Sequence, residues 1–442
     1  MINQDRIQST RTWVWAPRPE AVFLMLVLGL SVSFFAFFAI PIFFGPSQSM
    51  IFPEYVPTIR PIGWDLRLML SYVQDWLTPG GAPYAGGNPY PPLAMILFWP
   101  LAKMEPRVSF AVLSGLTLGA YLWCAGFFPY LALLPRRLSP SAVLLFGVGL
   151  FSYPLHFEIE RGQWNLIAMA LTLAGVTIAR RRESLRLLGY VLITVGIQLK
   201  IYPAVVLSAL IVDWAHPRRD LRNVIILLAA NAALFFVMGP GLFVEFVTSV
   251  LRQVAAPGVW LGNHSIASFA ALVGAELTQR GIAVAGILQT IVALTCLIAL
   301  LAGAAVLGIA LWRRGERSLD GYVILTAALI GVLVPSVSHD YTLAALIGLV
   351  GLVLAEEEGR QVPALGAQAT RFAAVRFAAL LVLCVSFGAV LFSFAYKPAW
   401  VANNMPFLLV TFLMTVTLRW MRTFPALRNQ PLPPRMGEEE VA

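Results

Sequence analysis

A polar loop at residues 45–92 contains the side chains best suited to chemistry in a chain that is otherwise strongly apolar. A carboxylate beside an apolar surface can remove a proton from a bound hydroxyl group and so act as a general base. Asp65 is the strongest candidate for that role. The charged residues of the loop are Glu54, Arg60, Asp65, Arg67 and Asp75, which stand among tryptophans, tyrosines and prolines.

Helical geometry separates Asp65 from Asp75. A helix over residues 65–77 places Asp75 on a solvated arc, whereas Asp65 borders the apolar arc. This is the pattern of an amphipathic helix that lies in the membrane interface. Aspartate is also a common N-terminal helix cap, and the pattern alone does not decide between capping and catalysis. The apolar arc consists of Leu66, Met69, Leu70, Val73, Trp76 and Leu77.

Further polar residues stand next to the ends of apolar segments. Lys200 is the most conspicuous, because a charge in a membrane span costs about 2.5–3.5 kcal/mol on insertion scales. An anionic ligand such as a lipid phosphate explains it, and snorkelling to the interface is the alternative. For the others, the competing interpretation is a polar interfacial turn, a structural histidine or, for Tyr84 and Tyr90, the belt of aromatic residues at a membrane interface. These candidates are Tyr84, Tyr90, Arg161, Gln163, Asn165, Tyr202, Asn263, His264, Ser265, His339 and Tyr341.

The elements that position these residues are membrane helices. Of the 442 residues, 59% are hydrophobic and 12% charged, and the mean hydropathy is +0.78. Apolar runs such as 21–44, 221–246, 287–312 and 377–394 are long enough to cross a hydrocarbon layer of about 30 Å. We therefore expect an all-α polytopic membrane protein. The net charge of +9 lies mainly in turns between spans, which indicates positive-inside topology and not a nucleic-acid partner.

Charge placement predicts the topology. Thirteen apolar segments can be counted, but both tails carry arginines, so the number of crossings should be even. Segment 91–104 is short and broken by Pro100. If it only enters the outer leaflet, about twelve helices cross, and every arginine-rich turn and both termini are cytoplasmic. A rival choice fuses residues 187–214 into one tilted helix, but it leaves Arg218 and Arg219 outside.

This topology places the polar candidates together on the external face. Residues 1–425 form one transmembrane domain with the loop 45–92 outside, and residues 426–442 form a disordered cytoplasmic tail. We expect the first span, 21–44, to be retained. Cys124, Cys296 and Cys384 lie inside apolar segments and should be buried free thiols. The sequence has no motif with metal-ligand spacing, so it supports no metal and no cofactor, but it does not exclude a metal because Asp65 and Glu158 could meet in space.

The ordered set of polar clusters resembles glycosyltransferase family 87, a GT-C membrane family of polyprenol-phosphate-mannose-dependent mannosyltransferases. Each cluster alone is weakly specific, but together they span about residues 60–345. After Asp65, the matching pieces are Gly81-Ala82-Pro83-Tyr84, Tyr90-Pro91-Pro92-Leu93-Ala94, Arg161-Gly162-Gln163-Trp164-Asn165, Lys200-Ile201-Tyr202-Pro203, Asn263-His264-Ser265 and His339-Asp340-Tyr341.

The resemblance implies a GT-C fold and an inverting transferase in the inner membrane. Its donor would be a polyprenyl-phosphate sugar, carrying mannose or another hexose or pentose, and its acceptor a lipid or glycan on the external, periplasmic side. Asp65 would be the general base and His339 would lie near the substrates. His264 stands where the family usually has glutamine, so the resemblance assigns it no detailed role.

The chemistry of the candidate side chains is consistent with this mechanism. Asp65 would take the acceptor proton, and Lys200, Arg161 and His339 would support the departing lipid phosphate. The alternative function is a transporter or flippase for a lipid-linked or small polar substrate. Against it, the polar groups gather at one face and not near the midplane, and the two halves of the chain show no repeat.

Overall fold

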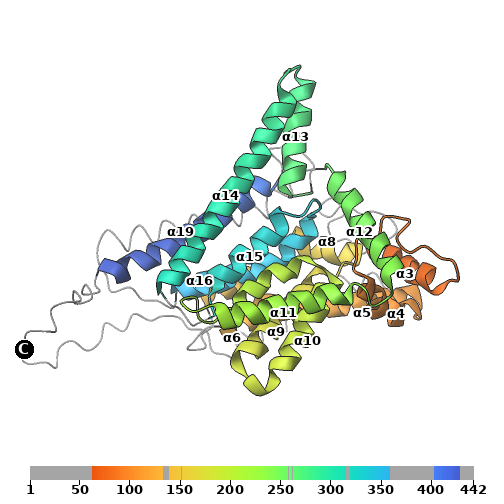
Figure 1. The fold of residues 1–442 in the computed structure, drawn as a ribbon, viewed down its shortest axis with the longest axis horizontal. Coiled ribbons are helices and arrows are strands. Elements are labelled where there is room, and N and C mark those ends of the chain that lie inside the picture. The colour runs from red at the N-terminus through yellow and green to blue at the C-terminus, as the bar shows by residue number, and fades with distance from the viewer. Residues whose placement is uncertain are drawn as a thin grey trace, which may run out of the picture.

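In a computed structural model of the protein, the described residues are 62–132, 139–150, 152–256, 258–260, 262–314, 319–358 and 403–428 (Figure 1). These ranges form helices and no strand, with one isolated antiparallel bridge between Asn263 and His339. The all-α prediction is therefore confirmed for this part of the chain. The predictions for the first span, for Cys384, for the apolar run 377–394 and for most of the tail lie outside it.

The helices before the middle of the chain are α3 (Trp64–Leu77), α4 (Pro92–Ala102), α5 (Pro106–Tyr121), the π-helix η4 (Leu122–Phe127), α6 (Phe128–Ala132), α7 (Pro140–Leu150), α8 (Tyr153–Arg161), α9 (Asn165–Arg181), the 3₁₀ turn η5 (Glu183–Leu185), α10 (Arg186–Leu199) and the 3₁₀-helix η6 (Tyr202–Leu210). The later ones are α11 (Arg218–Leu234), α12 (Pro240–Ala255), α13 (Ile266–Gln279), α14 (Ala285–Arg314), α15 (Gly321–Leu333), the 3₁₀-helix η7 (Asp340–Ala345), α16 (Leu346–Glu358) and α19 (Met405–Arg428).

Several helices are long and apolar enough to indicate a membrane protein. The continuous helix Pro106–Ala132 and the segment Ala285–Arg313 of α14 are long and apolar enough to cross a bilayer. The pair α8 and α9 also qualifies if it is one span, bent by 107° at its break. At about 1.5 Å per residue, the 11 residues of α4 measure only about 17 Å, in agreement with a segment that does not cross. The total number of crossings stays a prediction.

One predicted helix is broken. The apolar run 221–246 was expected to be continuous, but α11 ends at Leu234 and α12 begins at Pro240. The reason is local, because Gly239 has a φ of 97°, which disfavours other residues, and Pro240 cannot continue the hydrogen bonding of a preceding helix. The rival choice of one helix through residues 187–214 is not observed, because α10 ends at Leu199 and η6 begins at Tyr202.

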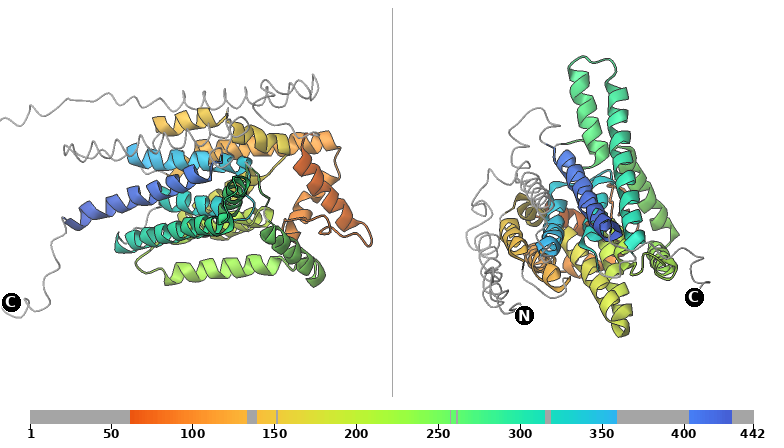
Figure 2. Two further views of the ribbon diagram at one scale, coloured as in Figure 1. Left: turned by 90° about the horizontal axis from the view of Figure 1, so that it is seen from above. Right: turned by 90° about the vertical axis from the view of Figure 1, so that its left-hand side faces the viewer.

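The helix predicted over residues 65–77 corresponds to α3. Leu66, Met69, Leu70 and Val73 are buried, as the apolar arc requires, but Leu77 at the end of the arc is exposed. Figure 2 shows α3 and α12 at one end of the molecule and the C-terminal part of α19 at the other.

The antiparallel pair α9 and α10 packs especially closely. A Cβ atom on Gly196 would meet the Thr172 hydroxyl at 2.4 Å, and one on Gly189 would meet the Gly175 carbonyl oxygen at 2.7 Å. Small residues allow such close approach between membrane helices. The pair therefore holds the first residue of α9 and the last residues of α10 together at one end of the bundle.

Candidate functional site

The carboxylate of Asp65 lies in a buried polar cluster at the start of α3. It accepts a hydrogen bond from Arg161 Nε at 3.1 Å and others from the Arg161 Nη2 and Gln163 side-chain nitrogens. Gly63, and not Asp65, precedes the helix, and no side chain caps it. The capping interpretation of Asp65 is therefore wrong, and its carboxylate is instead held by two residues from the α8–α9 connection.

Gly162 sets the geometry of that connection. It ends α8 in the left-handed conformation, with φ 64°, where glycine carries no steric cost. The Gly63 amide donates to the Glu160 carbonyl oxygen at 2.7 Å, so the start of α3 is docked on the end of α8. The reversal at Gly162 lets both of its neighbours, Arg161 and Gln163, reach Asp65.

Buried hydrogen bonds fix the start of α9. Glu158 accepts from the Asn165 side chain at 2.9 Å and from the Leu166 amide at 3.0 Å, which satisfies a free N–H of the helix terminus. The Tyr202 hydroxyl donates to the Asn165 carbonyl oxygen at 3.1 Å. Asn165 and Tyr202, both predicted to bind substrate, thus join α8, α9 and η6 around the site.

Lys200 lies in the turn that follows α10, next to two aromatic rings. Its Nζ atom is 3.5 Å from the Tyr90 hydroxyl and 4.6 Å from the centre of the Tyr90 ring, and 5.2 Å from the Trp164 ring. Burial lowers the pKa of Lys200, although the nearby Glu158 and Asp65 charges oppose the shift. Trp164 was not among the predicted site residues; its signal was its position between Gln163 and Asn165.

Tyr84 has a different position from Tyr90. Its hydroxyl donates to the Tyr90 carbonyl oxygen at 3.1 Å, and its ring packs against Phe246 of α12. The Ser249 hydroxyl donates to the Asn88 carbonyl oxygen at 2.7 Å. Tyr84 therefore contributes to the packing of the first loop on α12, while Tyr90 reaches Lys200.

The Asn263-His264-Ser265 segment pairs with the loop before η7. The His264 amide donates to the Ser338 carbonyl oxygen at 2.7 Å, and the Asn263 side-chain oxygen accepts from the Ser265 and Ser338 amides. His264 Nε2 lies 2.5 Å from the Asp340 carboxylate, and both side chains are fully buried. His264 thus contacts Asp340 and the backbone of the loop before η7, so its contacts are those of a residue that supports this loop.

His339 and Tyr341 stand on that loop. Trp260 Nε1 donates to His339 Nδ1 at 3.1 Å, so a neutral His339 carries its proton on Nε2. Burial, together with the Lys200 and Arg161 charges, lowers the pKa of His339 to about 3. A neutral His339 donates a hydrogen bond without adding charge. The Tyr341 ring packs edge-on against it, with centroids 5.1 Å apart.

These contacts bring most of the predicted residues to one place. Electrostatic interactions connect Lys200 with Asp65 and Glu158, and His339 with Lys200 and Arg161. Two carboxylates, two cations and one neutral imidazole donor therefore surround the same region. Such a set can remove a proton and stabilise a departing anion. Within the described ranges, no group of three or more His, Cys, Asp or Glu could hold a metal ion.

Comparison with known proteins gives one match. The model of glycosyltransferase family 87 matches residues 88–336, a range that contains Arg161, Lys200 and the Asn263 segment but neither Asp65 nor His339. No curated protein and no solved structure matches the chain. Because the family model covers more than half of the sequence, the chain belongs to glycosyltransferase family 87.

Proposed function

We propose that the protein transfers a sugar from a polyprenyl-phosphate donor to a lipid or glycan acceptor at the external face of the inner membrane. The sugar is mannose or another hexose or pentose, and the anomeric carbon is inverted. About twelve crossings with both termini in the cytoplasm would place the site outside. The observation that carries the proposal is the buried Asp65–Arg161–Gln163 cluster beside Lys200 and His339.

Asp65 is the general base of this proposal. It takes the proton of the acceptor hydroxyl as the oxygen forms a bond to C1 of the sugar. A carboxylate has about four lone-pair positions, so it can accept this proton while it stays bonded to Arg161 and Gln163. Removing a general base typically lowers a rate by about 10²–10⁴-fold.

The donor phosphate leaves with the electron pair of the broken C1–O bond. Arg161 Nη1 is buried without a hydrogen-bond partner, so it has a donor available for a phosphate oxygen. The Lys200 ammonium group supplies a second charge, and the His339 Nε2 hydrogen supplies a neutral donor. Charged donors of this kind stabilise a developing anion most strongly where water is excluded.

The test compares two aspartates of α3 in the full-length protein, reconstituted with a polyprenyl-phosphate mannose donor and membrane lipids as acceptor. We expect Asp65→Asn to lose at least about a hundredfold in transfer rate. Asp75→Asn removes an equal charge from the exposed face of the helix and should keep the wild-type rate. Full activity of a folded Asp65→Asn variant would contradict the proposal, as would uptake of solute without any sugar transfer.

A further inference from the structure

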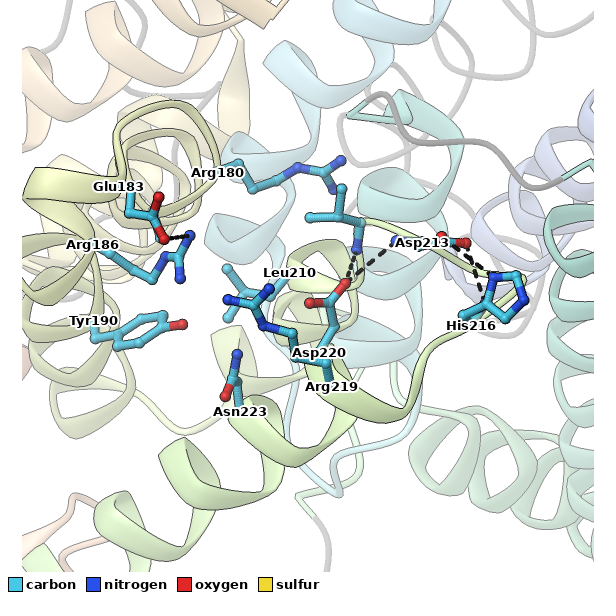
Figure 3. A pocket seen from close by; sticks show the side chains of 12 residues that line it. Arg180, Glu183, Arg186, Tyr190, Leu210, Asp213, His216, Arg219, Asp220 and Asn223 are labelled. Carbon is cyan, nitrogen blue, oxygen red and sulfur yellow. Dashed lines mark hydrogen bonds and ion pairs between the residues drawn. The ribbon is translucent and has the colours of Figure 1, made fainter.

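A cavity lies at the other end of α9 and α10 from Asp65. Asn165, beside the candidate site, and Arg180, which lines the cavity, are separated by 15 residues of one helix, or about 23 Å. The cavity measures about 560 Å³ and lies between the α9–α10 hairpin and the start of α11 (Figure 3). On the proposed topology it opens at the cytoplasmic face.

Two similar pairs of hydrogen-bonding side chains line the cavity. Arg186 and Tyr190 are four residues apart on α10, and Arg219 and Asn223 are four residues apart on α11. Residues at this spacing share one helix face. The two helices therefore present the same combination to the cavity, one guanidinium group and one neutral hydrogen-bonding group each.

The helix termini beside these arginines add to the attraction for an anion. Arg186 is the first residue of α10, and Arg219 the second of α11. The N-terminus of a helix carries partial positive charge and free N–H groups, so a cation there is disfavoured and an anion is favoured. Positive-inside topology explains arginines at this membrane face, but it does not require three of them to line one cavity. Arg180 donates to the Ala209 carbonyl oxygen, and Arg186 and Arg219 are the two that belong to the pairs above.

The acidic residues that line the cavity already have partners within the protein, either backbone amides or an arginine. Asp220 accepts from the Val212 and Asp213 amides at 2.7 and 3.3 Å, and Asp213 accepts from the Ala215 amide at 3.0 Å. These bonds shape the turn before α11. Glu183 pairs with Arg186 at 3.3 Å, but its side chain is 81% exposed, and such surface pairs are weak.

We propose that this cavity binds a phosphate group, carried by the headgroup of an anionic membrane lipid or by a free phosphate ester, at the face opposite the candidate active site. Two guanidinium groups from different helices match the several oxygens of a phosphate. Tyr190 and Asn223 add neutral hydrogen bonds. The proposal does not depend on the chemistry assigned to Asp65.

The test measures ligand retention by the full-length protein in detergent with native mass spectrometry. The probes are phosphatidylglycerol, phosphatidylcholine and glycerol phosphate. The cavity variant Arg186→Gln/Arg219→Gln is compared with Arg218→Gln/Arg222→Gln, which removes the same charge from exposed neighbours that do not line the cavity. The single variant Arg219→Gln, at an exposed position, serves if the double variant does not fold.

We expect the wild type to retain phosphatidylglycerol better than phosphatidylcholine. The cavity variant should lose about tenfold or more in affinity, as expected when charged hydrogen bonds are removed, while the exposed-neighbour variant keeps the wild-type value. Loss confined to phosphatidylglycerol assigns the site to a lipid headgroup, and loss that includes glycerol phosphate assigns it to phosphate esters in general. Equal retention by the two double variants, or no preference for the anionic phosphatidylglycerol over the zwitterionic phosphatidylcholine, overturns the proposal.

Discussion

Substituting alanine for Gly162 should separate α3 from the end of α8 and so disturb Asp65. Gly162 has φ 64°, and a Cβ atom there would lie 2.9 Å from Leu66 Cβ. The left-handed conformation costs a residue other than glycine roughly 1–2 kcal/mol. Overpacking adds about 1–3 kcal/mol, because Leu66 Cβ is attached to the backbone and cannot turn away.

A shift of α3 away from Gly162 would also move Asp65, which lies on the same helix. Nonbonded carbon atoms prefer a separation of about 3.5–4.0 Å, so α3 must retreat by at least about 0.5 Å. The Arg161 Nε to Asp65 bond of 3.1 Å would then lengthen to about 3.6 Å, which is too long for a hydrogen bond. We therefore expect Gly162→Ala to reduce sugar transfer as well as stability.

Gly80 provides the matched control. Its φ is 75°, but nothing lies within 4 Å of the position of its Cβ atom, so Gly80→Ala carries the conformational cost alone. In thermal unfolding of the detergent-purified protein, Gly80→Ala should lower the midpoint by roughly 2 °C. Gly162→Ala should lower it two to three times as far. Equal shifts in the two variants would refute the packing argument.

Three further predictions concern ionisable side chains. Arg419 and Asp320 form a buried ion pair at 2.6 Å, and Arg419→Met should lower the free energy of unfolding by about 3–5 kcal/mol. A double-mutant cycle with Asp320→Asn measures the coupling between the two side chains, and additive effects would contradict the prediction. Because the pKa of His339 is lowered from 6.5 to about 3 by burial, the unfolded chain binds more protons between these values, so stability falls as pH falls below 6.5. His339→Gln should lose less stability between pH 7 and pH 4.5, and equal losses would contradict this. Burial also lowers the pKa of Lys200 below 10.5, so Lys200 should lose its charge at alkaline pH. The affinity for polyprenyl phosphate should then decline in the wild type but not in Lys200→Arg, and a parallel decline in both would count against phosphate binding by Lys200.

The sequence predicts the grouping of the site better than its internal contacts. Charge placement along apolar segments is a long-range constraint, and it was enough to place Arg161, Lys200 and His339 on the side of Asp65. The partner of His264 could not be predicted in this way. The burial of Asp340 against His264 depends on two loops that meet only in the folded chain.

Local geometry explains the other differences. The sequence shows Gly239 and Pro240 inside an apolar run, and hydropathy alone does not register the helix break that they cause. The capping interpretation of Asp65 was open for a similar reason. Aspartate satisfies a helix terminus or an arginine equally well, and only the reversal at Gly162 brings Arg161 within reach.

The bend between α8 and α9 connects the fold with the proposed chemistry. A break in an apolar segment frees backbone groups that need partners, and Glu158 satisfies one of them at the Leu166 amide. The same break directs Arg161 and Gln163 toward Asp65 and leaves Arg161 Nη1 without a partner. A straight helix through residues 153–181 would carry Arg161 and Gln163 on different faces, because consecutive residues are about 100° apart. The bend is therefore what allows one short segment both to hold the base and to leave a cationic donor for a departing phosphate.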